Sequence, residues 1–230
     1  MDSNTPSARD YDDTMKNNLL SIFVIGGALA LPLVAQEPKP DVKPPIEKPK
    51  VELFKVGATI PESLALKDLD GKALSFKELR GKVVIVHFWS DRCPAEIHGD
   101  PVTKSLEKTY AGKDVVILGV ASNQNELGTE PPKDADYSKQ YLNLREKIKE
   151  VGFAHRIIAD HKNVLSNLFQ AKSTPHCYVI DQKGVLRYAG ALDDDPGETK
   201  GDKAKVYVRD AADALLAGKE VEVKETKSYG

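Results

Sequence analysis

The chain has two cysteines, Cys93 and Cys177, and the first stands in a setting that predicts reactivity. Cys93 follows the apolar, β-branched run 83–89 after a short polar turn, and Pro94 comes directly after it. A run rich in Val and Ile is typical of a buried strand, and proline is favoured at the first position of a helix. Because the N-terminal end of a helix stabilises anions and lowers the pKa of a thiol there, the spacing predicts a nucleophile at Cys93.

The segment 88–96, which reads Phe-Trp-Ser-Asp-Arg-Cys-Pro-Ala-Glu, resembles the active-site region of thioredoxin-fold redoxins. These are the TlpA/ResA-type thiol–disulfide oxidoreductases and the AhpC/TSA peroxiredoxin-like proteins. The reductases read Cys-Pro-x-Cys, so Glu96 occupies the place of their second cysteine. In the alternative register, Cys-x-x-Cys-Pro, Ser90 occupies the place of the first. Either register leaves one cysteine of the pair, and a vicinal CxxC disulfide cannot form.

A second stretch, 185–194, resembles the Gly-x-x-Arg-Tyr-x-Gly-x-Ile-Asp-Asp segment of the peroxiredoxin-like group, and 214–227 resembles its C-terminal helix and tail. The resemblance covers roughly 56–230. It implies an α/β, thioredoxin-like three-layer fold with a central mixed sheet, an N-terminal strand extension and a central insertion.

The residue pattern by itself predicts strands that alternate with helices, followed by a hairpin and a last helix, which is typical of a layered α/β domain. Asp70-Gly71 predicts a hairpin turn between 64–66 and 72–74. Strands are expected at 82–89, 114–121, 156–159, 177–180 and 185–189. Helices are expected at 75–80, after Pro94, and at 137–151, 164–171 and 203–216, with a polar loop at 123–136.

Thr174-Pro175 resembles the cis-proline loop that packs beside the active cysteine of the thioredoxin fold. The resemblance implies that Thr174 and Pro175 form a wall of the substrate site, where the Thr174 backbone pairs with a substrate strand. Cys177 lies two residues beyond Pro175, on the same face of a strand. Two interpretations of Cys177 stay open: a resolving thiol that meets Cys93, and a small core residue, since free cysteine is often buried.

Three residues near Cys93 are expected to support it. Arg92 is adjacent and is expected to help hold a thiolate. Ser90 takes the place at which peroxiredoxins hold the peroxide, although Val86 replaces the proline of that motif. Trp89 is expected to pack under the turn and, secondarily, to offer a substrate surface.

The sequence does not favour metal binding, nucleic-acid binding, phosphate binding or serine hydrolysis. The five histidines show no metal-ligand spacing, and we expect neither a metal nor another cofactor. The formal charge of -2, with mixed signs along the chain, does not suggest nucleic-acid binding. No phosphate-cradling glycine motif and no serine-hydrolase elbow are present.

The chain divides by composition into two N-terminal segments and a domain. Residues 1–35 contain the apolar run Leu19–Ala35, which predicts a signal peptide or, alternatively, a membrane tether. Residues 36–50 are rich in proline and charge, as expected for an extended linker. Residues 51–230 are expected to form the redoxin domain. We therefore predict an exported, periplasmic or extracytoplasmic protein.

Three functional hypotheses follow from these residues. The first is an oxidoreductase that forms a mixed disulfide at Cys93 with a protein or a small-molecule thiol or disulfide, and that relies on an external thiol reductant or Cys177 for release. The second is a thiol peroxidase in which peroxide oxidises Cys93. The third is a redox-inactive module that binds a peptide in the cis-proline groove.

Overall fold

The computed structural model describes residues 52–230. The predicted signal peptide or anchor of 1–35 and the predicted linker of 36–50 lie outside the described residues. Within 52–230, no helix has both the length and the apolar character needed to cross a membrane.

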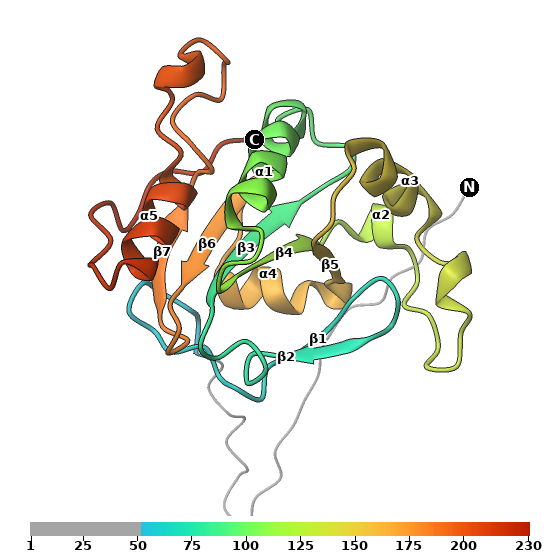
Figure 1. The fold of residues 1–230 in the computed structure, drawn as a ribbon. Coiled ribbons are helices and arrows are strands. Elements are labelled where there is room, and N and C mark those ends of the chain that lie inside the picture. The colour runs from blue at the N-terminus through green and yellow to red at the C-terminus, as the bar shows by residue number, and fades with distance from the viewer. Residues whose placement is uncertain (1–51) are drawn as a thin grey trace, which may run out of the picture. The chain divides into compact units, whose positions relative to one another are not determined.

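A five-stranded mixed sheet with the order β5-β4-β3-β6-β7 forms the centre of the domain (Figure 1). Its strands are β3 (Val83–Trp89), β4 (Val115–Ala121), β5 (Arg156–Ala159), β6 (His176–Ile180) and β7 (Leu186–Gly190). β3, β4 and β5 run parallel, whereas β6 pairs antiparallel with both β3 and β7. This is the thioredoxin-like arrangement that the sequence predicted.

Helices cover both faces of this sheet, as a three-layer fold requires. The helices are α1 (Glu96–Tyr110), α2 (Gln124–Leu127), α3 (Leu142–Val151), α4 (Val164–Phe169) and α5 (Tyr207–Leu216). Side chains of β3 alternate between the two faces. Val83 and Ile85 pack in the cluster that includes α1 and α5, whereas Val84, Val86 and Phe88 pack in the cluster that includes α4. Every side chain of β3 is buried, so this strand is a rigid base for the turn that follows it.

The predicted N-terminal hairpin is confirmed as β1 (Ala65–Lys67) and β2 (Ala73–Ser75), which form a two-stranded sheet of their own. Gly71 takes a positive φ of 76° in the turn between them. Single bridges, Asp68 to Ile158 and Thr59 to Val185, connect this region to the central sheet. The N-terminal extension therefore lies beside the central sheet and does not lengthen it.

The short helix predicted at 75–80 is wrong. The Ser75 backbone N–H and hydroxyl both donate to Glu78 Oε2, at 2.7 and 2.8 Å. This capping holds consecutive turns, which Gly81 ends with a φ of 84° directly before β3. The capping interaction predicted at Ser75 therefore forms, but turns and not a helix follow it.

Two of the longer predicted helices are shorter than expected. The helix predicted at 137–151 is divided into a 3₁₀ turn, Tyr137–Lys139, and α3, because Tyr141 takes a left-handed φ of 57° between them. The Arg145 guanidinium donates to Tyr137 O at 3.1 Å and to Leu69 O at 2.6 Å, which fixes this break. The last helix begins at Tyr207, since Lys205 N is bound to the Asp194 carboxylate at 2.9 Å in an extended segment.

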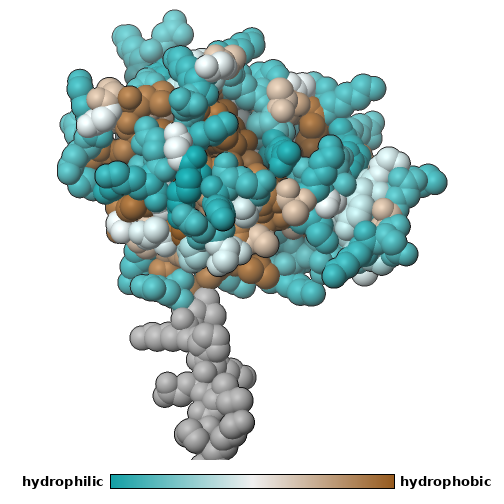
Figure 2. All heavy atoms as spheres, turned by 60° about the horizontal axis from the view of Figure 1, so that its bottom comes forward, coloured by the Kyte–Doolittle hydropathy of each residue, from teal (hydrophilic) through white to brown (hydrophobic). Residues whose placement is uncertain are grey.

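The face at the starting ends of the central strands carries β1, β2 and the segment that precedes them. Figure 2 turns this face toward the viewer and shows hydrophobic atoms reaching the surface between hydrophilic ones. Phe54, Pro61, Leu64 and Leu168 line a shallow hollow there. The residues predicted to do chemistry lie at the other end of β3.

Candidate active site

Cys93 lies in the turn between β3 and α1. α1 begins at Glu96, two residues later than Pro94 predicted, because Pro94 and Ala95 form a turn that leads into it. The Glu96 backbone N–H donates to Cys93 O at 3.0 Å, so Cys93 already belongs to the entry of the helix. Its side chain is half-buried. The thiol is therefore reachable at the end of α1 that favours negative charge.

The Thr174–Pro175 peptide is cis and lies beside this thiol, as the resemblance implied. Cys93 Sγ donates to Thr174 O at 2.9 Å. A carbonyl oxygen accepts a hydrogen bond only from the protonated thiol. This contact therefore holds the resting thiol, and reaction as a thiolate requires the sulfur to leave Thr174 O.

Ser90 is engaged by a residue that the sequence analysis did not single out. The Ser90 hydroxyl donates to Glu126 Oε1 at 2.5 Å, and Ser90 itself is buried. Burial raises the pKa of Glu126; the Ser90 hydrogen bond opposes this rise, and the charge of Asp91 adds to it. The Ser90 hydroxyl is thus engaged by a carboxyl group in this structure.

Arg92 and Pro94 flank Cys93 on the exposed side of the turn. The Arg92 side chain is 58% exposed, and its Nε lies 3.8 Å from Asp91 Oδ1. The expected Arg92–thiolate contact is therefore replaced by a loose pair with Asp91. Pro94 and, one turn further, Ile97 are exposed, the latter by 76%, so the solvent side of Cys93 has an apolar rim.

Trp89 packs beneath the turn, as predicted, and is only 1% exposed. Its Nε1 donates to Asp100 Oδ1 at 2.9 Å, and its ring meets Phe153 edge to face. Burial raises the pKa of Asp100 to about 6, while the hydrogen bond from Trp89 opposes that rise. The secondary role of Trp89 as a substrate surface does not fit this burial.

Glu96, in the place of the missing second cysteine, points into the core. Its Oε1 lies 3.1 Å from His87 Nε2, and both side chains are at most 3% exposed. The other ring nitrogen of His87 lies 3.3 Å from Thr103 Oγ1. Glu96 Oε2 is buried without a hydrogen-bond partner. A carboxylate and an imidazole therefore fill the space beneath Cys93.

Cys177 occupies the core. It lies opposite His87 in the β3–β6 pairing, is fully buried, and packs with residues of β3, α1 and α5. Burial, with the nearby carboxylates of Glu96 and Asp193, raises the pKa of its thiol. Both cysteines are free thiols in this structure. Of the two interpretations that the sequence left open, this environment is the one expected of a core residue.

His176, which follows the cis-proline loop, makes contacts that support the fold. His176 Nδ1 lies 3.1 Å from the Tyr178 hydroxyl, and burial lowers the pKa of His176 to about 4. Within residues 52–230, no group of three or more His, Cys, Asp or Glu side chains is arranged to hold a metal ion.

Comparison with known proteins agrees with this geometry. Residues 56–189, more than half of the chain, match the model of the AhpC/TSA family. The chain belongs to the AhpC/TSA family. The matched segment begins at Val56, ends within β7 and includes both Cys93 and Cys177.

This AhpC/TSA protein is similar to relatives of two named kinds. It is 27% identical over 132 residues to the thiol-disulfide oxidoreductase ResA of Geobacillus thermodenitrificans, across 57% of this chain and 67% of that protein. It is 24% identical over 131 residues to the chloroplastic peroxiredoxin Q of Triticum aestivum, across 56% of each chain. The matches thus span about two thirds or less of these relatives.

Among solved structures, the AhpC/TSA protein is similar to an uncharacterized conserved protein from Geobacillus kaustophilus. The TM-score is 0.64 at 25% identity, and the match covers 76% of this chain and 89% of that one. This likeness, together with the strand order of the mixed sheet and the cis-proline loop, shows the thioredoxin-like fold.

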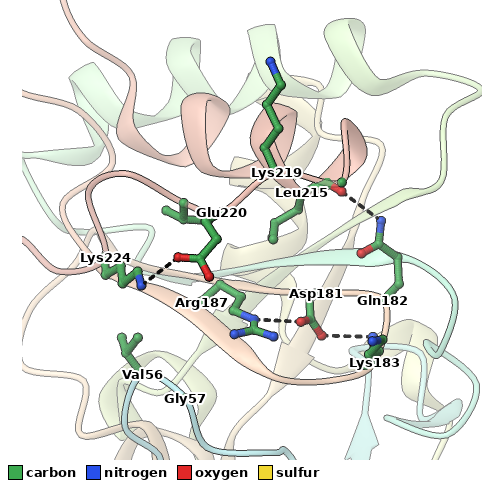
Figure 3. Close-up of a pocket in the computed structure, with 12 residues that line it drawn as sticks. Val56, Gly57, Asp181, Gln182, Lys183, Arg187, Leu215, Lys219, Glu220 and Lys224 are labelled. Carbon is green, nitrogen blue, oxygen red and sulfur yellow. Dashed lines mark hydrogen bonds and ion pairs between the residues drawn. The ribbon is translucent and has the colours of Figure 1, made fainter.

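A cavity of about 750 Å³ lies at the other end of the sheet from Cys93 (Figure 3). It is lined by charged side chains that pair with one another: Arg187 Nε to Asp181 Oδ2 at 2.7 Å, and Lys224 Nζ to Glu220 Oε2 at 3.3 Å. Neither cysteine lines it.

Sequence reasoning missed Glu126, the core position of Glu96, and the buried Asp193. Glu126 lies in α2, within a stretch that was predicted to be a polar loop, and only the fold places α2 against Ser90. The sequence identified Glu96 as the residue in the place of the missing second cysteine. Its spacing of three residues from Cys93, on the inner face of a helix, was the signal that it points toward β3.

Proposed function

We propose that this protein is an exported thiol–disulfide oxidoreductase that acts through a mixed disulfide at Cys93. The observation that carries the proposal is the contrast in access: the Cys93 thiol is half-exposed at the start of α1 beside Thr174, whereas Cys177 is fully buried. The names of the ResA-type relatives support the reaction class. The apolar run 19–35 supports export, and the mixed charge of the chain supports substrates other than nucleic acid.

The chemistry proceeds in two exchange steps. The Cys93 thiolate attacks one sulfur of a substrate disulfide; a Cys93–substrate disulfide forms, the substrate S–S bond breaks, and the other half leaves as a thiolate that takes up a proton. A thiolate from an external thiol then attacks the substrate sulfur of the mixed disulfide. Cys93 leaves as the thiolate, and the external thiol is joined to the substrate. No second protein thiol is consumed, and one disulfide is exchanged for another.

The decisive experiment compares Cys93→Ser with Cys177→Ala in the soluble domain. Cys93→Ser should lose disulfide exchange by at least about a thousandfold, because a serine hydroxyl is a far weaker nucleophile at neutral pH. Cys177→Ala should retain exchange within about threefold, because that thiol is buried in the core. The mixed disulfide should be trapped on Cys93 and identified by mass spectrometry.

The pH dependence of Cys93 alkylation in the Cys177→Ala variant tests the same proposal directly. A free thiol titrates near about 8.5 and an activated one between about 3.5 and 7.5. A midpoint in the lower range would support the nucleophile. Slow alkylation with an ordinary midpoint, together with unchanged behaviour of Cys93→Ser in every redox assay, would favour a redox-inactive binding module instead.

Thiol peroxidation is the second candidate, because the chain also resembles peroxiredoxin Q. In that reaction the Cys93 thiolate attacks one peroxide oxygen, the O–O bond breaks, and the other oxygen takes up a proton and leaves as water or an alcohol. Cys93 becomes a sulfenic acid, which two external thiols reduce to the thiol with release of water and formation of their disulfide. The commitment of the Ser90 hydroxyl to Glu126 makes disulfide exchange the better supported candidate. Consumption of hydrogen peroxide at a rate equal to or above that of disulfide exchange would reverse this order.

A further inference from the structure

The C-terminal segment of residues 224–230 runs along β7 toward the active site. The Ala189 backbone N–H donates to Lys224 O at 3.1 Å, and Thr226 N–H donates to Ala189 O at 3.1 Å. In Figure 1 the C-terminus lies beside the start of α1, where Cys93 precedes the helix. We call residues 228–230 the tail segment.

Residues at the end of β7 determine the path of the C-terminal segment. Gly190 takes a positive φ of 154°, and a Cβ at this position would collide with Thr226. The Thr226 hydroxyl accepts from Ala191 N–H at 2.8 Å and lies 2.7 Å from the Tyr188 hydroxyl. The sequence of β7 thus accommodates the C-terminal segment at a defined register.

Two residues of the tail segment lie at or next to the Thr174 wall of the site. Ser228 Oγ lies 2.9 Å from Ser173 Oγ, next to Thr174. Gly230 lies directly against the Thr174 carbonyl, so that a Cβ on Gly230 would collide with Thr174 O. That same oxygen accepts the hydrogen bond of Cys93 Sγ. The backbone of Thr174 is therefore covered by the chain's own tail segment on one side and contacted by the thiol on another.

Tyr229 fastens the tail segment to the active-site helix. Its hydroxyl donates to Asp193 Oδ1 at 2.8 Å, and Asp193 Oδ2 lies 2.6 Å from His98 Nε2 on α1. Asp193 is 1% exposed. A buried carboxylate thus links the tail segment to the helix that begins three residues after Cys93.

We infer that the tail segment is a specificity element that reserves Cys93 for disulfides of small molecules and excludes extended polypeptides. The inference rests on the proposed disulfide exchange and adds the substrate class. An extended polypeptide that docks on a backbone edge needs free N–H and C=O groups there. A small disulfide needs only access to sulfur, which the exposed side of Cys93, rimmed by Pro94 and Ile97, supplies.

The test uses two probes with the same leaving group: glutathione disulfide, and an extended peptide of about ten residues whose only cysteine is joined to glutathione. Attack on the peptide sulfur of the second probe, or on either sulfur of glutathione disulfide, releases glutathione and leaves a mixed disulfide on Cys93 that mass spectrometry measures. For the peptide probe only the Cys93–peptide disulfide is counted. We expect the native chain to react at least about tenfold more slowly with the peptide, because docking requires the tail segment to open.

Two variants open the tail segment by different means. Gly230→Ala forces it away from Thr174, and Tyr229→Phe removes the hydrogen bond to Asp193. Each should raise the rate with the peptide by about fivefold or more while leaving the rate with glutathione disulfide within about twofold. Gly197→Ala, a matched change in an open part of the β7–α5 loop, should alter neither rate.

Equal rates of the native chain with both probes, or an unchanged ratio in both variants, would overturn the inference. If Cys93 reacts with neither probe, the proposed function fails.

The tail segment is then tested by alkylation of Cys93 above about pH 8.5, where an ordinary thiol ionises. The quantity compared is the rate with iodoacetamide divided by the rate with a polymer-linked maleimide. A ratio that neither variant changes would overturn the inference, and a ratio that falls in both would support the steric role.

Discussion

The surroundings of Cys93 and Cys177 differ although the two cysteines belong to neighbouring parts of one sheet. Cys93 lies just beyond the end of β3, half-buried, and contacts the carbonyl of Thr174. Cys177 lies within β6, opposite His87, with no exposed surface. Cys177 packs in a mainly apolar cluster, and nearby buried carboxylates add to the rise in its pKa. The neighbours of Cys93 are a turn, a loop and the chain's own tail segment.

This difference shows that the position of a thiol relative to the sheet determines its access to solvent in this domain. A strand interior withdraws the sulfur from water, and burial disfavours the thiolate. A strand end leads into a turn whose side chain can be reached, and the following helix favours the anion. Resolution of the mixed disulfide by Cys177 therefore requires opening of the core, whereas release by an external thiol does not.

The largest expected effect is a difference in labelling of the two thiols in the native chain. Exposure of Cys177 requires opening of the core, which typically takes 5–15 kcal/mol, so iodoacetamide should label Cys93 at least about 10⁴ times faster. Labelling of each cysteine is quantified by peptide mass mapping. Urea should accelerate labelling of Cys177 in parallel with unfolding. Native labelling of Cys177 within about tenfold of Cys93 would break the comparison and restore Cys177 as a resolving thiol.

The next effect comes from returning a thiol to position 96. Glu96→Cys in a Cys177→Ala background should release the mixed disulfide internally, because residues three apart in a helical turn lie within disulfide reach. The lifetime of the mixed disulfide should fall by at least about a hundredfold and become independent of external thiol, since the attack is intramolecular. Quenched-flow trapping followed by mass spectrometry measures that lifetime.

Glu96→Gln is the matched control for the introduced thiol. The amide keeps an oxygen near His87 but adds no nucleophile, so the mixed disulfide should remain dependent on external thiol. If Glu96→Cys shows the same dependence as Glu96→Gln, the side chain at 96 does not approach Cys93, and the two thiols are separated by more than the fold suggests.

Most of the fold was predictable because its signals are local. A few adjacent residues suffice to predict each of three elements: the β-branched strand β3, the Asp70-Gly71 turn and the Thr174-Pro175 loop. The predicted helix boundaries were wrong where a contact between residues far apart in the chain determines the local backbone. Arg145 fixes a break before α3 by binding Leu69 O, and Asp194 holds Lys205 out of α5. The helical periodicity of apolar residues in the sequence does not indicate such contacts.

The site was predictable to the same extent. Cys93 and Thr174 come together, as their motifs implied. The partner of Ser90 could not be predicted, because Glu126 reaches it from 36 residues away along the chain. The contact of Gly230 with Thr174 likewise depends on the path of the C-terminal segment along β7. Side chains that touch through tertiary packing have no sequence spacing that identifies them.

The smallest expected effect concerns Asp100, the buried carboxyl beneath the Cys93 turn. Its pKa is raised to about 6 in the folded chain, chiefly by burial. In the unfolded chain an aspartate titrates near about 3.9, so the unfolded state ionises first as pH rises. The contribution of Asp100 to stability is therefore complete below about pH 4 and is lost between about pH 4 and pH 6, by about 1–2 kcal/mol after allowance for partial solvent access.

Asp100→Asn removes this titration and keeps an oxygen that accepts from Trp89 Nε1. Urea unfolding should therefore show equal stabilities below about pH 4 and a variant that is more stable by about 1–2 kcal/mol at pH 7. Asp134→Asn, an exposed loop substitution, should follow the native pH profile. A native-like loss between about pH 4 and pH 6 in Asp100→Asn would place the titrating group elsewhere, with Glu126 beside Ser90 the next carboxyl of raised pKa to replace. The pH dependence would then belong to the turn that carries Cys93 and not to the core beneath it.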